Sequence, residues 1–417
     1  MLSQTQSLVQ SITHRLWRLL PANSRRAAMA HATAWLAPRP DRTPPPAAHG
    51  LTIAGEFARA SGIGEAARLM ANAAHHLGVP IWRVDVAPPV DARAELDRPL
   101  DEPPPPGAPL VIHINAPVLP LAFLRLPGSL PKNRRIIGCW YWELPSVPPG
   151  WQAGARFVHE IWAPSRFTAA ALEALAPGRV RVVPPALADV PPLPAHLGRA
   201  DFGLPDNAVI TLVSFNLASS FARKNPLGAI AAFRAAFGDR PDRILVLKIG
   251  HPDHAPGDFK ILREAAQAPN IRLETRTLPT ADSHALTACC DIVLSLHRSE
   301  GFGLVPAEAM LLGKPVIATG WSGNMDFMDH NNAALVGHHL IPVVDDRKVY
   351  RDSVWAEPNL TDAVAHLRRL ADSAEARQAL GARARHSARA RLTSEPLAEA
   401  LRAIGLPVPG RPTGPAG

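Results

Sequence analysis

Short β-rich runs alternate with helical stretches in both halves of this chain, and this alternation limits its fold more than any other feature. Helical patterns such as EAARLMANAAHHLG and NPLGAIAAFRAAFG lie between the runs. Parallel strands need a crossover, usually a helix, so the order predicts two α/β domains with parallel sheets. The predicted strands are 51–55, 81–86, 110–115, 134–140, 160–164 and 180–184 in the first half, and 209–215, 243–249, 271–275, 291–296 and 315–319 in the second.

Proline-rich segments indicate where the domains begin and end. The chain has 417 residues, whereas a single domain usually has about 100 to 200. TPPPAA precedes the first predicted strand, and DVPPLPAHLG lies near mid-chain. Such segments do not form regular elements. We therefore expect an extension and linker at 1–48, a first domain at 49–190, a linker at 191–203, a second domain with terminal helices at 204–403 and a disordered tail at 404–417.

Composition excludes several classes of protein. Hydrophobic residues make up 47% of the chain and charged residues 19%, as in globular proteins. The three cysteines, Cys139, Cys289 and Cys290, have no metal-ligand spacing, so neither a disulfide framework nor a structural zinc site is expected. No apolar run approaches the roughly 18 residues of a membrane span, and the first 40 residues lack a signal peptide. We expect a cytoplasmic protein.

The net charge of +8 indicates an anionic partner. A nucleotide, a lipid surface or a nucleic acid would each suit it. No basic stripe with interleaved aromatic residues is present, so we do not expect nucleic-acid binding. Residues 7–20 predict a basic amphipathic helix, with Leu8, Ile12, Leu16 and Leu19 at helical spacing. This helix either lies on an anionic membrane surface or packs on the first domain.

The strongest motif is HRSEGFGLVPAEAMLLGKPVIATGWSGN, residues 297–324. It leaves a predicted buried strand, crosses a short polar loop and enters a helix near Leu304. Gly301 and Gly303 allow the backbone to approach a ligand closely. A helix start directs unpaired N–H groups at an anion. The segment therefore predicts an anion-binding loop.

Two carboxylates, Glu300 and Glu308, flank this helix start. A ligand with hydroxyl groups at both ends and phosphate between them fits such a layout, and a nucleotide sugar is one. The alternative is an ordinary strand-to-helix turn with two structural glutamates.

With Glu300 and Glu308 eight positions apart, the segment resembles the E-x7-E signature of the retaining family-4 glycosyltransferases. Their GT-B fold has two Rossmann-like domains that face each other across a cleft. The resemblance covers roughly residues 50–400. It implies that Glu300 contacts the transferred sugar, that Glu308 binds the ribose hydroxyls, and that the amides of Gly303 and Leu304 meet the diphosphate. It also implies an N-terminal acceptor domain, a C-terminal nucleotide-sugar domain and a final helix that crosses back.

The loop GEFARASGIGEAAR leaves the first strand and enters a helix at Glu65. Its glycines, including Gly62 and Gly64, suit an anion cradle, although a plain tight turn explains them equally well. By position the loop resembles the family's first loop, which closes over donor phosphate and acceptor. We therefore expect Gly62 and Gly64 to contact the donor.

Arg223 and Lys224 lie just ahead of a predicted helix in SFNLASSFARKNPLGAIAAF. Cations there can neutralise negative charge as it develops on a diphosphate leaving group. Lys224 matches the family's lysine. The family's arginine falls near position 218 or 219, so that role is unfilled or passes to Arg223. The alternative is an exposed basic helix start.

Two loops of the first domain carry further predicted site residues, with Asn115 predicted as a catalytic residue and His113, Trp142 and Glu143 as acceptor-binding residues. VIHINAP contains His113 and Asn115 where many family members have His-x-His-Glu. Asparagine can hydrogen-bond a hydroxyl but cannot act as an acid or base, and a buried strand histidine is the alternative for His113. GCWYWELP supplies Trp142 and Glu143. An aromatic face beside a carboxylate suits a sugar or lipid acceptor, and core packing is the alternative.

No metal or cofactor is expected. His251, Asp253 and His254 in HPDHAPGD match no standard ligand set, and the family's pattern requires no divalent ion. SGNMDF, residues 322–327, predicts a second backbone nest near the donor.

The resulting hypothesis is a retaining transferase that moves a hexose from a GDP- or UDP-linked sugar to a saccharide or lipid-linked acceptor in cell-surface polysaccharide synthesis. GDP-mannose is slightly favoured by resemblance. The alternative is a non-catalytic protein of the same fold that binds a saccharide or a partner.

Overall fold

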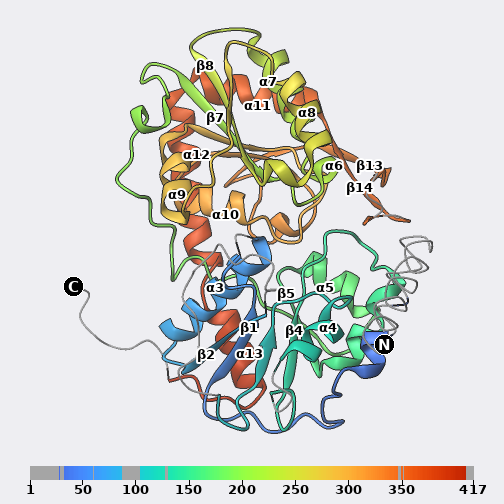
Figure 1. Cartoon of the computed structure of the whole chain (residues 1–417). Helices are drawn as coiled ribbons and strands as arrows, with labels where there is room; N and C mark the ends of the chain where they lie inside the picture. The colour runs from blue at the N-terminus through green and yellow to red at the C-terminus, as the bar shows by residue number, and fades with distance from the viewer. Residues whose placement is uncertain are drawn as a thin grey trace, which may run out of the picture.

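The computed structural model describes residues 28, 32–59, 61–86, 104–126, 130–345, 349–350 and 352–409. It contains two domains, one above the other in Figure 1, and each is built on a six-stranded sheet covered by helices. All paired strands within these two sheets are parallel. The predicted α/β class with two parallel-sheet domains is confirmed.

The first sheet has the order β2-β1-β3-β4-β5-β6. Its central strands are buried along their whole length, as expected for a parallel sheet with both faces covered. All six strands occur where the sequence predicts them. The bounds are β1 Leu51–Gly55, β2 Ile81–Asp85, β3 Leu110–Ile112, β4 Ile136–Cys139, β5 Glu160–Ala163 and β6 Val180–Val182, with helices α3 Gly62–His76, α4 Leu119–Arg125 and α5 Arg166–Glu173 and 3-10 turns η1 Pro149–Trp151 and η2 Gly154–Phe157.

The second sheet has the order β12-β11-β10-β7-β8-β9. Five of its strands occur where predicted; β12 was not predicted. The strands are β7 Val209–Asn216, β8 Arg243–Gly250, β9 Ile271–Glu274, β10 Ile292–Ser295, β11 Val316–Thr319 and β12 Ala334–Val336. The helices are α6 Phe221–Lys224, α7 Pro226–Phe237, α8 Pro256–Ala265, α9 Thr280–Cys289, α10 Leu304–Leu311, α11 Leu360–Asp372 and α12 Ala374–Arg391, with 3-10 turns η3 Ala200–Phe202, η4 Pro252–His254 and η5 Gly323–Asp326.

An antiparallel hairpin, β13 His338–Pro342 and β14 Val354–Pro358, extends from the second domain toward the first. The sequence did not predict it. Tyr350 and Trp355 are buried in the hydrophobic core of the first domain. The hairpin therefore links the two domains.

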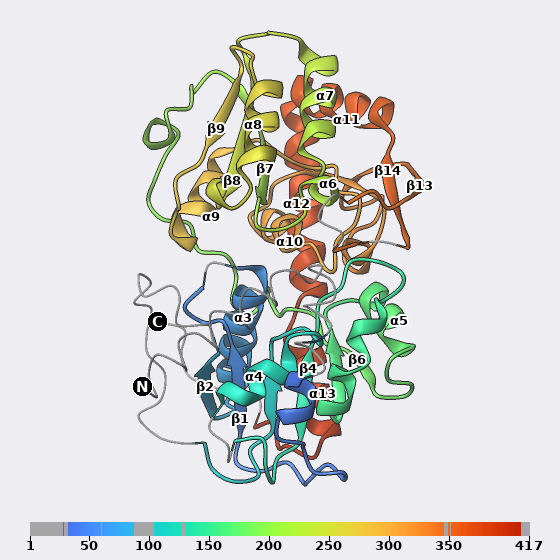
Figure 2. The same cartoon turned by 45° about the vertical axis from the view of Figure 1, so that its right-hand side comes forward.

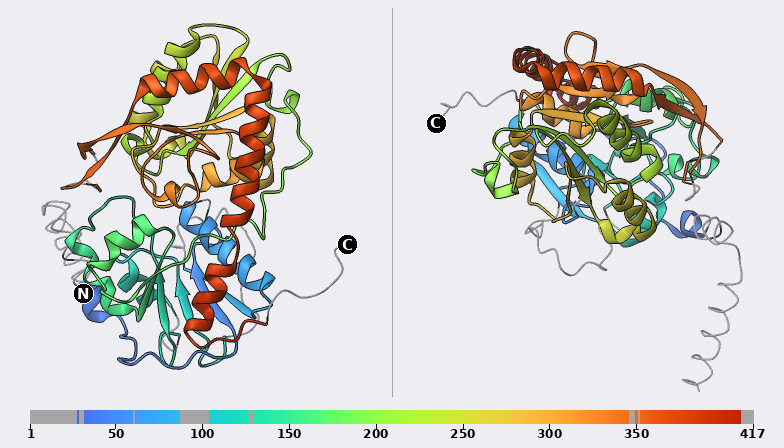
Figure 3. Two further views of the ribbon diagram at one scale, coloured as in Figure 1. Left: turned by 180° about the vertical axis from the view of Figure 1, so that it is seen from behind. Right: turned by 90° about the horizontal axis from the view of Figure 1, so that it is seen from above.

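The last helix, α13 Glu395–Ala403, packs against α3 although it follows the second domain in sequence. In the left view of Figure 3 the chain leaves α12 and returns to the first domain. Leu397 and Leu401 are buried there, and so are Ile404 and Leu406 of the predicted tail. The final helix thus crosses back, and the tail is packed as far as Leu406.

In the part of the chain that the structure describes, no helix is long and apolar enough to cross a membrane. The predicted amphipathic helix at 7–20 and residues 410–417 of the predicted tail lie outside the described residues.

Candidate active site

Two neighbouring strands of the second sheet deliver the main charged residues. β7 and β10 pair directly, so the loops after their carboxyl ends lie side by side, and ligands of such sheets bind at that edge. The loop after β7 leads into α6, whose first turn is capped by Ser220 accepting from the Arg223 amide at 3.2 Å. Asn225 adopts a left-handed conformation and separates α6 from α7. Arg223 and Lys224 are thereby brought next to Glu300.

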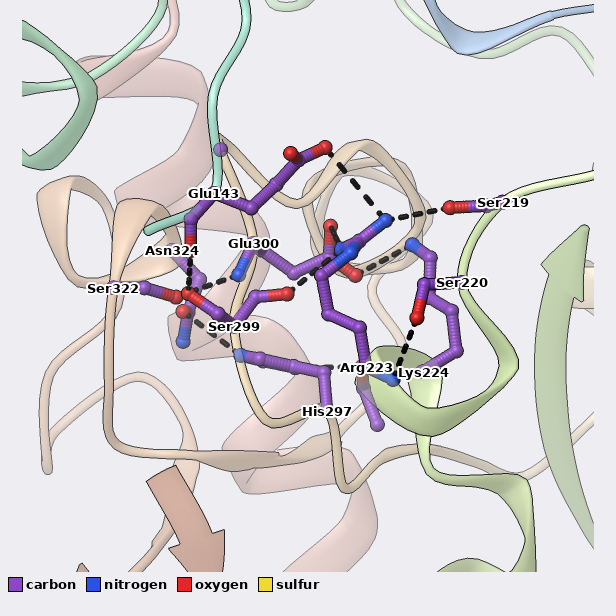
Figure 4. Close-up of polar contacts among 12 residues, drawn as sticks. Glu143, Ser219, Ser220, Arg223, Lys224, His297, Ser299, Glu300, Ser322 and Asn324 are labelled. Carbon is purple, nitrogen blue, oxygen red and sulfur yellow. Dashed lines mark hydrogen bonds and ion pairs between the residues drawn. The ribbon is translucent and has the colours of Figure 1, made fainter. Parts of the chain in front are cut away.

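Glu300 forms ion pairs with both cations (Figure 4). Lys224 Nζ lies 2.5 Å from one carboxylate oxygen, and Arg223 Nη1 lies 3.1 Å from the other. Only 8% of Glu300 is exposed. Burial by itself raises the pKa of Glu300, but the charges of Lys224 and Arg223 outweigh it and lower the pKa to about 2. The carboxylate is therefore ionised at neutral pH.

Arg223 lies at the centre of Figure 4 and connects three loops. Nη1 also donates to the Ser299 carbonyl at 2.7 Å, and Nη2 donates to Ser219 Oγ at 2.6 Å. Nη2 lies 3.7 Å from Glu143 of the first domain. Burial by itself lowers the pKa of Arg223, but Tyr350 and the two carboxylates raise it overall. The guanidinium stays charged and joins carboxylates from both domains.

Lys224 is the more accessible cation. Its side chain is 21% exposed, against 3% for that of Arg223. A lysine ammonium is a compact charge on a flexible stem, so it can turn from Glu300 to an incoming anion. Arg223, whose Nη groups already contact Ser219, Ser299 and carboxylates, is better placed to organise the site.

A layer of polar residues supports the Glu300 loop from behind. Ser322 Oγ accepts from the Glu300 amide at 2.8 Å, and the Gly323 amide donates to the Glu300 carbonyl at 2.9 Å. A Cβ on Gly323 would lie 2.2 Å from the Gly301 carbonyl oxygen, so only glycine permits this approach. The 322–327 segment, predicted as a nest for the donor, thus packs against the Glu300 loop.

His297 and Asn324 complete this layer, and the sequence analysis missed both. His297 Nε2 lies 3.1 Å from Asn324 Oδ1, and Asn324 Nδ2 donates to the Thr319 carbonyl at 3.0 Å. Burial lowers the pKa of His297, so the imidazole is neutral at neutral pH. Both residues lie within the motif at 297–324, and this motif was the sequence signal that could have identified them.

Glu308 lies on α10, which faces α3 of the first domain in Figure 2. Gly303 begins this helix with φ of 100°, and no side chain in the described part of the chain caps it. Glu308 Oε1 lies 3.8 Å from His284 Nε2 on α9. Burial by itself lowers the pKa of His284, but the hydrogen bond and charge of Glu308 outweigh it, and the pKa rises.

The glycine-rich loop of the first domain forms a tight turn into α3, which begins at Gly62 and not at Glu65. Ser61 caps the helix by accepting from the Gly64 amide at 3.0 Å. A Cβ on Gly64 would lie 2.5 Å from the Glu56 carbonyl oxygen, whereas Gly62 has open space around it. Close packing against the Glu56 carbonyl therefore explains why residue 64 is a glycine. Contact of either glycine with the donor stays a prediction.

The predicted acceptor residue His113 and the predicted catalytic residue Asn115 occupy different environments. His113 is completely buried, with Nε2 3.3 Å from Met70 Sδ, and burial lowers its pKa to about 3. Asn115 joins two loops, because its side chain both donates to the Tyr141 carbonyl and accepts from the Tyr141 amide at 2.9 Å. These positions suit structural roles, so contact with a substrate stays a prediction for both.

Trp142 and Glu143 lie next to the charged cluster. Trp142 is 5% exposed and packs on Trp151, with ring centres 5.0 Å apart. The Glu143 side chain is 20% exposed and is directed toward Arg223 (Figure 4). Of the four predicted residues in these two loops, Glu143 is thus the one whose side chain reaches the Glu300 cluster.

The loop that carries Glu300 is attached to the first domain. Ser165 Oγ donates to the Gly301 carbonyl at 2.6 Å, and Thr168 Oγ1 donates to the same carbonyl at 3.2 Å. The Arg166 amide donates to Asp326 at 2.8 Å. Both domains therefore build the site.

Within the described residues no group of three or more His, Cys, Asp or Glu side chains could hold a metal ion. His251 of the HPDHAPGD segment instead lies 3.1 Å from the Asn216 side-chain amide.

Comparison with known proteins identifies related sequences and folds. A model described as "Family 4 Glycosyltransferase in conflict systems" matches residues 220–394. D-inositol 3-phosphate glycosyltransferase from Jonesia denitrificans is 29% identical over 194 residues, which are 44% of this chain and 43% of that protein. The chain therefore spans less than half the length of this curated relative.

Solved structures share the two-domain architecture. Sucrose-phosphate synthase from Thermosynechococcus elongatus superposes with a TM-score of 0.59 at 15% identity, over 85% of this chain and 98% of that chain. HepE from Anabaena, in complex with UDP-glucose, superposes with a TM-score of 0.56 at 15% identity, over 85% of this chain and 99% of that chain. The family match over most of the second domain shows similarity to family-4 glycosyltransferases, and the solved structures confirm the predicted GT-B fold.

Proposed function

We propose that the protein is a retaining glycosyltransferase that moves a hexose from a nucleotide sugar to a saccharide or lipid-linked acceptor. The observation that carries the proposal is the ionised Glu300, paired with Lys224 and Arg223 where the two domains meet. This cluster follows strands β7 and β10, at the sheet edge where α/β proteins bind ligands.

The donor would bind across α10. Glu308 would hold the ribose hydroxyls, and the amides at the helix start, near Gly303 and Leu304, would meet the diphosphate. HepE binds UDP-glucose, whereas the family resemblance slightly favours GDP-mannose. Both belong in the first panel of ligands.

The chemistry would be a same-face displacement. The bond between the anomeric carbon and the phosphate oxygen breaks, a bond to the acceptor oxygen forms on the same face, and the acceptor proton passes to the leaving phosphate. The protein's contribution is orientation and stabilisation of the diphosphate charge by Lys224, assisted by Arg223. We propose that the reaction needs no divalent metal.

The acceptor is proposed to be a saccharide or lipid-linked saccharide of cell-surface polysaccharide synthesis, used in the cytoplasm or at the inner face of the membrane. The family resemblance supports this assignment. The name of the Jonesia relative adds inositol 3-phosphate as an acceptor to test.

Thermal unfolding with UDP-, GDP- and ADP-sugars, each with and without Mg²⁺, tests the proposal. A ligand at about 100 times its dissociation constant adds roughly 2.7 kcal/mol and raises the midpoint by several degrees. We expect the sugars of one nucleotide to raise the unfolding midpoint by the same amount with and without Mg²⁺. A rise only with Mg²⁺ would contradict metal independence. No rise with any donor would favour a non-catalytic saccharide-binding protein.

A further inference from the structure

The β13–β14 hairpin delivers a tyrosine from the second domain to the charged cluster. Tyr350 is 7% exposed, and its ring lies 5.4 Å from that of Trp142 in the first domain. Its hydroxyl donates to Glu143 Oε2 at 2.9 Å, and the Arg223 guanidinium lies over its ring at 5.8 Å. Burial, followed by the charge of Glu143, raises the pKa of Tyr350, so the hydroxyl keeps its proton and donates.

The rest of the hairpin fixes Tyr350 in place. Asp345 accepts from the backbone amides of Val349 and Tyr350 at 2.9 and 3.1 Å. Ser146 of the first domain donates to Ser353 Oγ at 3.0 Å. The two bonds to Asp345 hold the backbone around Tyr350 independently of its hydroxyl, whereas the Ser146–Ser353 contact joins the hairpin to the first domain.

At the base of the hairpin, Arg298 and Glu357 form an ion pair of 2.6 Å. Arg298 also comes from the Glu300 loop, and its carbonyl accepts from the Ala356 amide at 2.9 Å. The hairpin is therefore joined to the Glu300 loop at one end and to the first domain at the other.

Counting contacts with the described residues alone, Glu143 keeps unused hydrogen-bonding capacity. A carboxylate has about four lone-pair sites; here Tyr350 donates to one oxygen, and Arg223 lies 3.7 Å from the other. The Glu143 side chain is 20% exposed, against 11% for that of Glu300. Glu143 is therefore the more accessible of the two carboxylates around Arg223.

We propose that Tyr350 is a positioning residue for acceptor binding, which holds the Glu143 carboxylate so that it accepts a hydrogen bond from the acceptor's sugar hydroxyl. Tyr350 is too deeply buried for its ring to serve as a sugar-stacking face. The inference rests on the proposed function and extends it, because it assigns part of the acceptor site to an element of the nucleotide-side domain.

The chain contains only two tyrosines, Tyr141 and Tyr350, which makes a direct measurement possible. Full-length protein labelled with [13Cζ]tyrosine gives two resonances, and Tyr350→Phe assigns them. The protein is saturated with UDP or GDP and titrated with the methyl glycosides of glucose and mannose and with myo-inositol. We expect at least one of these probes to shift the Tyr350 resonance and to leave that of Tyr141 in place.

Variants separate positioning from a structural role. Tyr350→Phe loses a hydrogen bond to a charged group, so we expect the dissociation constant of the glycoside, followed by calorimetry, to rise about tenfold. Nucleotide affinity should not change. Ser353→Ala is the matched control, because it removes another hydroxyl contact of the hairpin with the first domain. It should leave both affinities as they are.

Three results would overturn the inference while nucleotide binding persists: no probe shifts the Tyr350 resonance, Tyr350→Phe weakens nucleotide and glycoside equally, or Ser353→Ala reproduces its effect. Failure of the wild type to bind any nucleotide would instead refute the proposed function.

Discussion

Glu300 and His113 show how two buried titratable side chains can have opposite charge states. Burial opposes the charged form of each side chain. Glu300 has two cations within 3.1 Å and stays ionised, whereas the ring of His113 contacts Met70 Sδ and its pKa falls to about 3. The charged groups of the site are thus maintained by their partners, and His113 belongs to the neutral core.

His113 should make the protein less stable as the pH falls. Its pKa is about 3 when folded and near 6.5 when unfolded, so between these values the unfolded state binds the additional proton. Stability then falls by up to about 1.4 kcal/mol per pH unit for this group. Burial also lowers the pKa of His297, so this residue likewise makes the protein less stable as the pH falls. We expect His113→Leu to reduce the slope, measured by urea unfolding at several pH values between 6.5 and 5.

The matched control is His254→Leu, because His254 is exposed in the 3-10 turn η4. It should leave the slope unchanged. Glu300 does not contribute in this range, since its folded pKa is about 2 and its stabilising effect is lost only at lower pH, between its unfolded value and about 2. An equal slope in wild type and His113→Leu would show that the histidine is not buried neutral.

At the level of elements, the parallel strands other than β12 could be predicted and the hairpin could not. Buried strands such as β1 and β10 are short apolar runs bounded by turn residues, which is a local signal. β13 is mostly exposed, and its partner β14 follows a long loop. Pairing of that kind has no local pattern, so Tyr350 could not be connected with Glu143 from the sequence.

Helix α13 is predicted to stabilise the first domain. Leu401 is fully buried against that domain's core, and truncating such a leucine to alanine costs about 2–5 kcal/mol. We expect Leu401→Ala to lower the unfolding midpoint by several degrees in calorimetry. Glu399→Ala, at an exposed position of the same helix, should leave it unchanged. Equal midpoints for the two variants would contradict the packing of α13.

For the molecule as a whole, the site exists only where the domains meet. The sequence predicted Glu300, Lys224 and Glu143 as site residues, because each follows a recognisable strand. It could not show that Arg223 joins carboxylates of both domains, since the contact of Glu143 with Arg223 spans two domains. The supporting residue Asn324 lies in the same domain and motif as His297, but its contact with His297 forms only in the folded chain.

The central claim is that this joint site binds a nucleoside diphosphate through Lys224 and Glu308. Titration calorimetry with UDP and GDP on the wild type, Lys224→Ala and Glu308→Gln tests it most directly. Lys260→Ala serves as control, because its side chain is 72% exposed on α8. We predict that each site variant weakens binding about tenfold or more and that the control binds like the wild type. Unchanged binding in both site variants, or no binding by the wild type, would contradict the account.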